Sequence, residues 1–179
     1  MANITEKEKL ILGAAGAAGQ KDAITVDIDP AHKPDVLHDL NAAPWPFKDD
    51  SFKEVICHHV LEHLSDLPKA MKELHRITRK NGMIYIETPH FSSCHAHAPE
   101  HKLMFNYFAF DSYLAGSDYC WQKHDFKFKL LRREITFHRA FRRYLLHRLW
   151  NRIPKTYERF WTFIIPAEHI KLEIQPIKD

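Results

Sequence analysis

The 179-residue sequence predicts an α/β fold: a three-layer sandwich around a mostly parallel sheet, closed by an antiparallel pair of C-terminal strands. Two observations carry this prediction. Short strand-like runs, rich in β-branched residues, alternate with helical patterns over the first two-thirds of the chain. The last third holds two segments that alternate apolar and polar residues, as antiparallel strands do. The length favours one domain over residues 1–179, because chains usually divide only beyond about 250 residues.

Five strands are expected in the first half, at residues 9–12, 23–28, 35–38, 54–57 and 83–87. The segment 66–77 is expected to be a helix, because its apolar residues recur at the i, i+3, i+4 spacing. Ser65 or Asp66 can cap this helix, with Pro68 in its first turn. Only 13 residues separate Gly13 from Asp27, so the first crossover helix must be very short or missing.

The C-terminal segments 126–137 and 168–177 are expected to form the closing antiparallel pair. Two helices are predicted between them, at residues 138–151 and 156–165, with Pro154 and Pro166 as breaks. Neither a repeat nor a low-complexity linker separates these segments from the rest, so they are assigned to the same domain.

Charge is distributed unevenly along the chain. Residues 1–120 carry 12 Lys and Arg against 17 Asp and Glu, whereas residues 121–179 carry 14 against 6. The basic C-terminal part indicates either an acidic partner or an ordinary solvated helical surface, and both readings stay open. Three widely spaced cysteines argue against a disulfide scaffold and for a cytoplasmic, reducing compartment. The apolar stretch 10–19 is not expected to be a secretory signal, because its leader has no net positive charge.

The residues that follow the first four strands predict an adenosine site, because ligands of parallel α/β sheets bind at the carboxyl ends of the strands. Small residues after the first strand allow close backbone approach, and Asp27 after the second can accept both hydroxyls of a ribose. Asp39 can accept from an exocyclic amine, while Leu40 offers an apolar surface to a purine. The full set of predicted binding residues is Gly13, Ala14, Ala15, Gly16, Asp27, Ile28, Asp39, Leu40, Cys57 and His58.

The sequence resembles the class I S-adenosylmethionine-dependent methyltransferases, particularly small bacterial members of the Methyltransf_11 type. The resemblance covers about residues 9–90 and rests on several motifs. These are L-G-A-A-G at 12–16, V-D-I-D at 26–29, H-D-L-N at 38–41, D-S-F-K-E-V at 50–55 and H-V-L-E-H at 59–63. It departs from the family at Ala15, where the usual G-x-G loop has its second glycine.

The resemblance implies a Rossmann-like fold and an enzyme that binds S-adenosylmethionine. Gly13 and its neighbours would face the methionine part of the cofactor, Asp27 the ribose, and Asp39 with Leu40 the adenine. We expect transfer of a methyl group to oxygen or nitrogen of a small-molecule or sugar acceptor, which a lipid can carry. A histidine suits the removal of the acceptor's proton, and His101, with His97 and His90 as alternatives, is the predicted base.

Two alternative functions remain, and the role of the basic segment is open. The H-x-x-E-H pattern of His59, Glu62 and His63 fits a zinc-dependent hydrolase if the segment is helical, although no metal is predicted for the methyltransferase. The second alternative is a non-catalytic cofactor-binding module, which the irregular glycine loop fits, or an RNA-associated one. The basic, aromatic segment 132–159 fits a buried helical cap, an anionic membrane surface or, ranked third, RNA.

Overall fold

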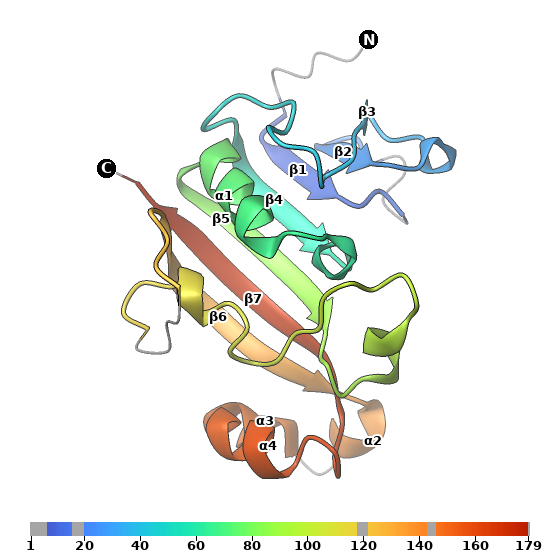
Figure 1. Ribbon diagram of the computed structural model, residues 1–179, viewed down its shortest axis with the longest axis vertical. Helices are drawn as coiled ribbons and strands as arrows, with labels where there is room; N and C mark the ends of the chain where they lie inside the picture. The colour runs from blue at the N-terminus through green and yellow to red at the C-terminus, as the bar shows by residue number, and fades with distance from the viewer. Residues whose placement is uncertain (1–6, 16–19, 118–121, 143–145, 179) are drawn as a thin grey trace.

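A seven-stranded mixed sheet forms the centre of the computed structural model, which describes residues 7–15, 20–117, 122–142 and 146–178 (Figure 1). The strand order is β3-β2-β1-β4-β5-β7-β6. The strands are β1 (Lys9–Leu12), β2 (Ala23–Asp27), β3 (Val36–Leu37), β4 (Phe52–His58), β5 (Thr78–Pro89), β6 (Lys127–Phe137) and β7 (Ala167–Ile177). Strands β1 to β5 are parallel to one another, and β7 runs antiparallel to both β5 and β6. The predicted α/β class with its antiparallel C-terminal pair is confirmed.

Helix α1 (Leu67–Ile77) packs on one face of the sheet. Asp66 caps it by accepting a hydrogen bond from the backbone N–H of Lys69 at 3.0 Å, and Pro68 lies in its first turn. Its buried apolar residues pack in one cluster with residues of β1, β2, β4, β5 and β7. The helix predicted at 66–77 is therefore confirmed together with its cap.

The other connections among the parallel strands are short. Within the described residues, the only α-helix between β1 and β5 is α1. The 3-10 turn η1 (Pro30–His32) lies between β2 and β3, and η2 (Leu61–His63) lies between β4 and α1. No helix occurs between β1 and β2 in the described part of that connection, as its length predicted. Two further 3-10 turns, η3 (Cys94–His97) and η4 (Asp111–Tyr113), lie in the long connection after β5.

The two faces of the sheet differ in character. Side chains alternate along each strand, and one set, including Val55, Ile86 and Leu172, is buried in the large core with α1. The opposite set includes Tyr85, Lys171 and Glu173, which are only half-buried. Parallel strands usually carry apolar side chains on both faces, because both faces are covered. The alternation seen here departs from that pattern, since the face that bears α1 holds most of the core.

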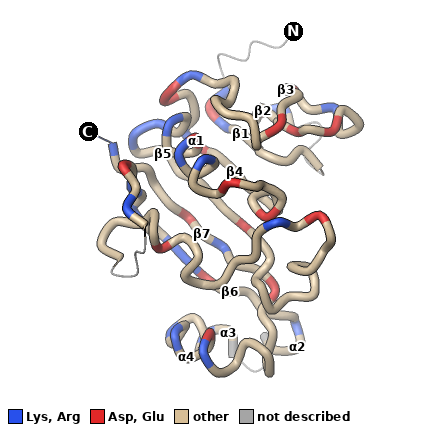
Figure 2. Tube along the Cα trace, viewed as in Figure 1, with Lys and Arg blue, Asp and Glu red and all other residues tan. Residues whose placement is uncertain are grey.

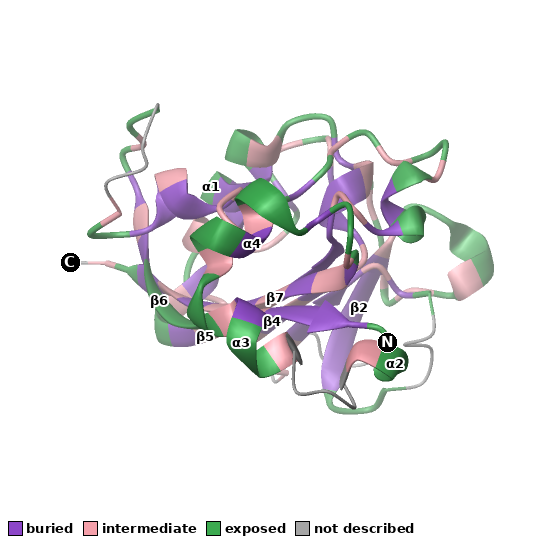
Figure 3. Ribbon diagram, turned by 90° about the horizontal axis from the view of Figure 1, so that it is seen from below, coloured by how far each residue is buried: buried purple, intermediate pink, exposed green. Residues whose placement is uncertain are grey.

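The C-terminal helices are shorter than the sequence predicts. The expected helix 138–151 is α2 (Arg139–Arg142) and α3 (Leu146–Arg152), whose connection lies outside the described residues. The expected helix 156–165 is α4 (Pro154–Phe160). Pro154, predicted as a break, begins α4, because proline needs no hydrogen-bond donor in a first turn. Seen edge-on in Figure 3, α1 and α4 lie on the same side of the sheet.

The edge strand β6 is covered by α3. Asn151 accepts a hydrogen bond from the backbone N–H of Ile135 at 2.7 Å and donates one to its carbonyl at 2.9 Å. This side chain thus satisfies backbone groups that an edge strand otherwise presents to solvent. None of the helices in the described residues has the length and apolar character of a membrane span.

Candidate functional site

The carboxyl ends of the parallel strands border a cavity of about 440 Å³. This volume lies within the range of roughly 300–1,000 Å³ that is typical of small-molecule sites. We call it the cofactor-edge cavity. It is lined by Gly13, Ala15, Asp27, Ile28, Asp29, His32, His38, Asp39, Leu40, Asn41, His59, Val60, His63, Leu64, Glu100 and Lys102. Six of the ten predicted binding residues are therefore brought together at this edge.

Gly13 turns the chain at the end of β1. Its φ of +81° is a conformation that only glycine adopts without strain. Its N–H donates to the carbonyl of Val26 at 2.9 Å, and its Cα packs near Val60, which follows β4. The next residue, Ala14, is buried and donates its N–H to Asp27. Gly16, also predicted to bind the ligand, lies outside the described residues.

Asp27 ends β2 with its carboxylate held in place. One oxygen, Oδ2, accepts the N–H of Ala14 at 2.7 Å and lies 3.1 Å from Nδ1 of His32. The other, Oδ1, accepts the N–H of Asp29 at 2.9 Å. Burial opposes ionisation, but the backbone donors and His32 outweigh it and lower the pKa of Asp27 below its usual value. Because a carboxylate has about four lone-pair positions, Oδ1 keeps one for a ligand.

Asp39 and Leu40 present complementary surfaces after β3. Oδ1 of Asp39 accepts both the backbone N–H and the side-chain amide of Asn41, at 2.9 and 3.0 Å. These bonds lower the pKa of Asp39, so the carboxylate is ionised at neutral pH with Oδ2 outside this turn. Leu40 is buried, and its carbonyl accepts the indole N–H of Trp45 at 3.0 Å. The turn therefore combines an anionic acceptor with a fixed apolar surface.

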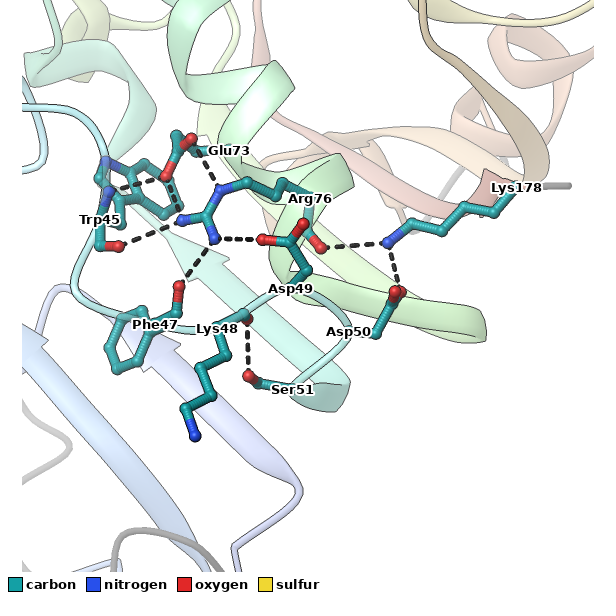
Figure 4. A network of polar contacts seen from close by, with 9 residues as sticks. All are labelled: Trp45, Phe47, Lys48, Asp49, Asp50, Ser51, Glu73, Arg76 and Lys178. Atoms are coloured by element: carbon teal, nitrogen blue, oxygen red, sulfur yellow. Dashed lines mark hydrogen bonds and ion pairs between the residues drawn. The ribbon is translucent and has the colours of Figure 1, made fainter.

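Arg76 of α1 holds the connection between β3 and β4 in place (Figure 4). Its guanidinium donates to the carbonyls of Trp45 and Phe47, to Asp49 and to both oxygens of Glu73, over 2.6–3.1 Å. Glu73 also accepts the N–H of Trp45 at 2.7 Å. A loop without a helix of its own is thereby fixed behind Leu40 by one bidentate ion pair.

The residues after β4 differ from the prediction. Cys57 is fully buried in the core, and burial raises the pKa of its thiol well above the usual range. His58 is exposed and lies on the face opposite α1, 3.6 Å from a carboxylate oxygen of Glu87. His59 adopts a φ of +53° and lines the cavity instead. Because side chains alternate along a strand, only one of these neighbours can face the ligand side, and the chain turns after His58.

The H-x-x-E-H segment is not an α-helix. Leu61–His63 forms a single 3-10 turn, so His59 and His63 do not share a helical face. Among the described residues, the groups that could hold a metal ion separate these histidines, placing His59 with His58 and Glu87 and His63 with Glu62 and His101. The geometric basis of the zinc-hydrolase alternative is therefore wrong.

The three histidines predicted as bases occupy different environments. His90 is fully buried, with Nδ1 2.8 Å from the hydroxyl of Ser92 and Nε2 3.0 Å from Glu158. Both of its ring nitrogens are thus engaged away from the cavity. His97 is exposed on η3. His101 lies beside the cavity, with its ring 4.7 Å from that of the lining residue His63.

A second cavity, of about 640 Å³, lies between the connection after β5 and helix α4. We call it the α4 cavity. Its walls are aromatic and charged: Phe91, Asn106, Phe108, Asp111, Ser117, Lys155, Glu158 and Arg159. Glu158 also accepts the N–H of Tyr107 at 2.7 Å, which ties α4 to this connection. No local sequence pattern predicts this cavity, because its two walls are about 50 residues apart along the chain.

Comparisons with known proteins agree with this geometry. Residues 12–86, from the end of β1 into β5, match the family described as a methyltransferase domain. No curated protein matches the chain significantly.

Solved structures share the fold over nearly the whole chain at low identity. A SAM-dependent methyltransferase from Archaeoglobus fulgidus is 14% identical with a TM-score of 0.54, covering 96% of this chain and 87% of that one. An S-adenosylmethionine-dependent methyltransferase from Mesorhizobium loti is 12% identical with a TM-score of 0.57, covering 98% and 93%. The N-methyltransferase NodS from Bradyrhizobium japonicum, solved with S-adenosyl-L-homocysteine, is 8% identical with a TM-score of 0.58, covering 96% and 79%. The match over residues 12–86 and the shared fold make the chain similar to S-adenosylmethionine-dependent methyltransferases in sequence over that stretch and in fold over nearly its whole length.

Proposed function

We propose that the protein binds S-adenosylmethionine in the cofactor-edge cavity and methylates oxygen or nitrogen of a small-molecule or sugar acceptor. The observation that supports this most strongly is the convergence of Gly13, Asp27, Asp39 and Leu40, from three successive strand ends, on one cavity. When bound, the cofactor supplies an activated methyl group on its sulfonium. The chain's own part is to hold the cofactor and to align the acceptor with it.

The residues present fit the adenosine part of this cofactor. Asp27 has a free lone pair on Oδ1 for one ribose hydroxyl, and His32 covers the position on Oδ2 that a second hydroxyl would take. The His32 side chain is 41% exposed, so it can turn into solvent when the ligand arrives. Oδ2 of Asp39 would accept from the exocyclic amine of adenine, with Leu40 against the ring, since both residues line the cavity. Gly13, which lines the cavity at the end of β1, would face the methionine part.

The α4 cavity supports a polar acceptor. Its asparagine, carboxylates, lysine and arginine can bind hydroxyl groups in either direction, while Phe91 and Phe108 offer apolar surfaces to a sugar ring. The cavity lies beside the segment that follows β5, whose last residue is Pro89, and β5 ends at the same edge of the sheet as the cofactor strands.

The surface around α3 and α4 favours an acceptor carried on a lipid in an anionic membrane. Its exposed apolar residues are 37–85% accessible to solvent: Leu149, Ile153, Phe160, Trp161, Phe163 and Ile164. Helix α4 also carries two basic residues, Lys155 and Arg159, and Figure 2 shows Lys and Arg positions along this helix. Aromatic and aliphatic residues interleaved with basic ones are typical of helices that lie at a membrane interface. We call this surface, residues 149–164, the α4 patch.

Calorimetric titration with S-adenosylhomocysteine tests the cofactor assignment. Asp27→Asn should weaken binding at least about tenfold, since a hydrogen bond to a charged group is worth about 1.5–3 kcal/mol. Asp66→Asn is the matched control, because Asp66 lies outside the cavity and asparagine caps a helix equally well. Absent binding by the parent protein, or equal affinity in Asp27→Asn, would overturn the assignment.

An acceptor screen with methyl-labelled S-adenosylmethionine tests the second half of the proposal. Transfer of label to a glycan or to another hydroxyl- or amine-bearing small molecule supports it. Label found only in RNA or protein would contradict the proposed acceptor class while leaving the cofactor site intact.

A further inference from the structure

Glu62, His63 and His101 form a compact group at the rim of the cofactor-edge cavity. Each offers one ligand atom, and these three atoms lie within 4.8 Å of one another. Glu62 and His63 belong to η2, after β4, whereas His101 comes from the connection after β5. Of the three residues, His63 lines the cavity, so the group adjoins the space proposed for the cofactor.

The two segments that carry this group are fixed to each other by the backbone. The carbonyl of Glu62 accepts the N–H groups of Lys102 and Leu103, at 2.7 and 3.1 Å. The ammonium of Lys102 donates to the hydroxyl of Ser65 at 3.0 Å. These bonds set the position of His101 relative to Glu62 before any ligand binds, which is how a preorganised site is built.

Two polar atoms of the group lack partners. In the part of the chain that the structure describes, Oε2 of Glu62 and Nδ1 of His101 are buried and make no hydrogen bond. Glu62 as a whole is 1% exposed, and its other oxygen lies 3.1 Å from Nδ1 of His59. Burying a carboxylate oxygen without a partner is costly, so a buried orphan of this kind calls for an explanation.

We propose that Glu62, His63 and His101 bind a divalent transition-metal ion of the zinc type. Two imidazoles and one carboxylate are a common ligand set for Zn²⁺, with bonds of about 2.0–2.2 Å. In a tetrahedral site two such ligands lie about 3.4 Å apart, so the group closes by up to about 1.4 Å when the ion binds. Three protein ligands leave one position for water or an oxygen of the acceptor, as in catalytic rather than structural zinc sites.

A neighbouring group around Glu87 has similar geometry but a different charge balance. His58, His59 and Glu87 also bring three ligand atoms within 4.8 Å. There, however, Glu87 already accepts from Tyr85 and pairs with the ammonium of Lys171 at 3.1 Å. A lysine thus supplies the positive charge that a metal would bring. Within the described residues, Glu62 pairs with His59 through Oε1 but with no lysine or arginine, and its Oε2 stays without a partner.

This inference does not rest on the proposed function, since the orphaned atoms exist whether or not the cofactor binds. It does replace the predicted role of His101 as a base. An imidazole whose Nδ1 binds a metal carries its proton on Nε2 and keeps no lone pair for an acceptor's proton.

Cobalt titration of the full-length protein, purified without a histidine tag and treated with chelator, tests the site. One equivalent of Co²⁺ should give the visible absorption bands of a low-coordinate ion, and Zn²⁺ should displace it. Removing a ligand should weaken binding by at least about 100-fold, because loss of a mere supporting partner costs 10–100-fold. The informative variants are Glu62→Gln, which keeps the shape of the buried side chain, and His101→Ala.

His97→Ala and His58→Ala serve as controls, because both remove exposed histidines outside the group. Both should bind cobalt as the parent does. The absence of cobalt bands in the parent protein would overturn the proposal. Full binding by His101→Ala and Glu62→Gln would overturn it too, because it would indicate an adventitious ion only. Loss of binding in His58→Ala alone would place the metal at Glu87 instead and overturn it equally.

Discussion

The rim of β1–β4 and the β6–β7 half of the molecule differ in which side chains they bury and which they expose. At the rim, the loops direct their polar groups inward, and Asp27, Asp39 and Glu73 are each held by several donors. In the C-terminal half, the α4 patch leaves large apolar side chains in solvent, up to 85% exposed at Phe163. The difference teaches that the first half gathers its polar groups around a cavity, whereas the second half leaves large apolar side chains exposed on its surface.

The two halves also use arginine differently. Arg76 makes five donor contacts with its side chain 24% exposed. Arg132 of β6 is 62% exposed and pairs only with Glu134 and Glu173 among the described residues. Buried and exposed ion pairs differ greatly in their contribution, so this contrast leads to the largest expected effect.

Arg76→Ala should lower the free energy of unfolding by about 3–5 kcal/mol, because it leaves the Glu73 carboxylate buried without its partner. The comparison variant Arg132→Ala should cost less than about 1 kcal/mol. Urea unfolding followed by circular dichroism measures both. Equal losses for the two arginines would break the contrast between the halves.

Phe163→Ser combined with Ile164→Ser should weaken binding to vesicles of phosphatidylglycerol and phosphatidylcholine at least about tenfold. Each of these side chains contributes up to about 1.5–3 kcal/mol when removed from water. Leu37→Ser combined with Met104→Ser is the control, since both residues are exposed but lie outside the α4 patch. Co-sedimentation with vesicles is the measurement, and unchanged binding in the first variant would mean that no membrane covers this surface. Affinity for S-adenosylhomocysteine should stay the same in both.

Glu73→Gln should show a smaller, pH-dependent loss of stability, because glutamine keeps the shape but not the charge. Burial opposes ionisation of Glu73, but hydrogen bonds from Arg76 and from the backbone of Trp45 hold its pKa below 4.5. A depressed pKa contributes stability that is fully present above pH 4.5 and is lost as pH falls through the folded-state value. The difference between parent and variant should therefore be largest near pH 7 and shrink below pH 4.5. A difference that grows on acidification would contradict this sign.

His32→Ala has the smallest expected effect. Removing the ring that covers Oδ2 of Asp27 should leave affinity for S-adenosylhomocysteine unchanged or raise it by up to about threefold. A threefold change is smaller than the effect of gaining or losing one charged hydrogen bond, which is worth roughly 1.5 kcal/mol. Titration calorimetry at constant pH measures it. A large loss of affinity would show instead that His32 itself contacts the ligand.

Much of the rim could be predicted because its signals are local. The strand at 9–12 is followed by a glycine with positive φ, and Asp27 and Asp39 follow strands that their own residues define. The turn after β4 was missed by one residue: Cys57 and His58 were predicted, whereas His59 lines the cavity. The alternation along β4 and the positive φ at His59 explain why His59, rather than Cys57 or His58, lines the cavity. The alternation can be inferred from the sequence, whereas the backbone angle at His59 cannot.

The histidines after β5 could not be sorted from the sequence. His90, His97 and His101 are spaced closely, yet one is buried, one is exposed and one lies against His63. A connection without regular structure has no periodicity from which to infer the direction of a side chain. The shortening of the helices at 138–165 has the same origin, since apolar spacing marks a helical tendency but not where packing ends it.

The amino-acid sequence by itself determined where the strands lie along the chain, the single long crossover helix and the acidic residues at the rim. These follow from local preferences and from the rule that parallel strands end at one edge of a sheet. Only the tertiary structure decided which distant groups meet: Glu158 with His90, Arg76 with the loop at 45–49, and His101 with Glu62. Such contacts depend on the paths of loops through space, which are set by packing and by the need to satisfy buried polar groups rather than by nearest neighbours in the chain.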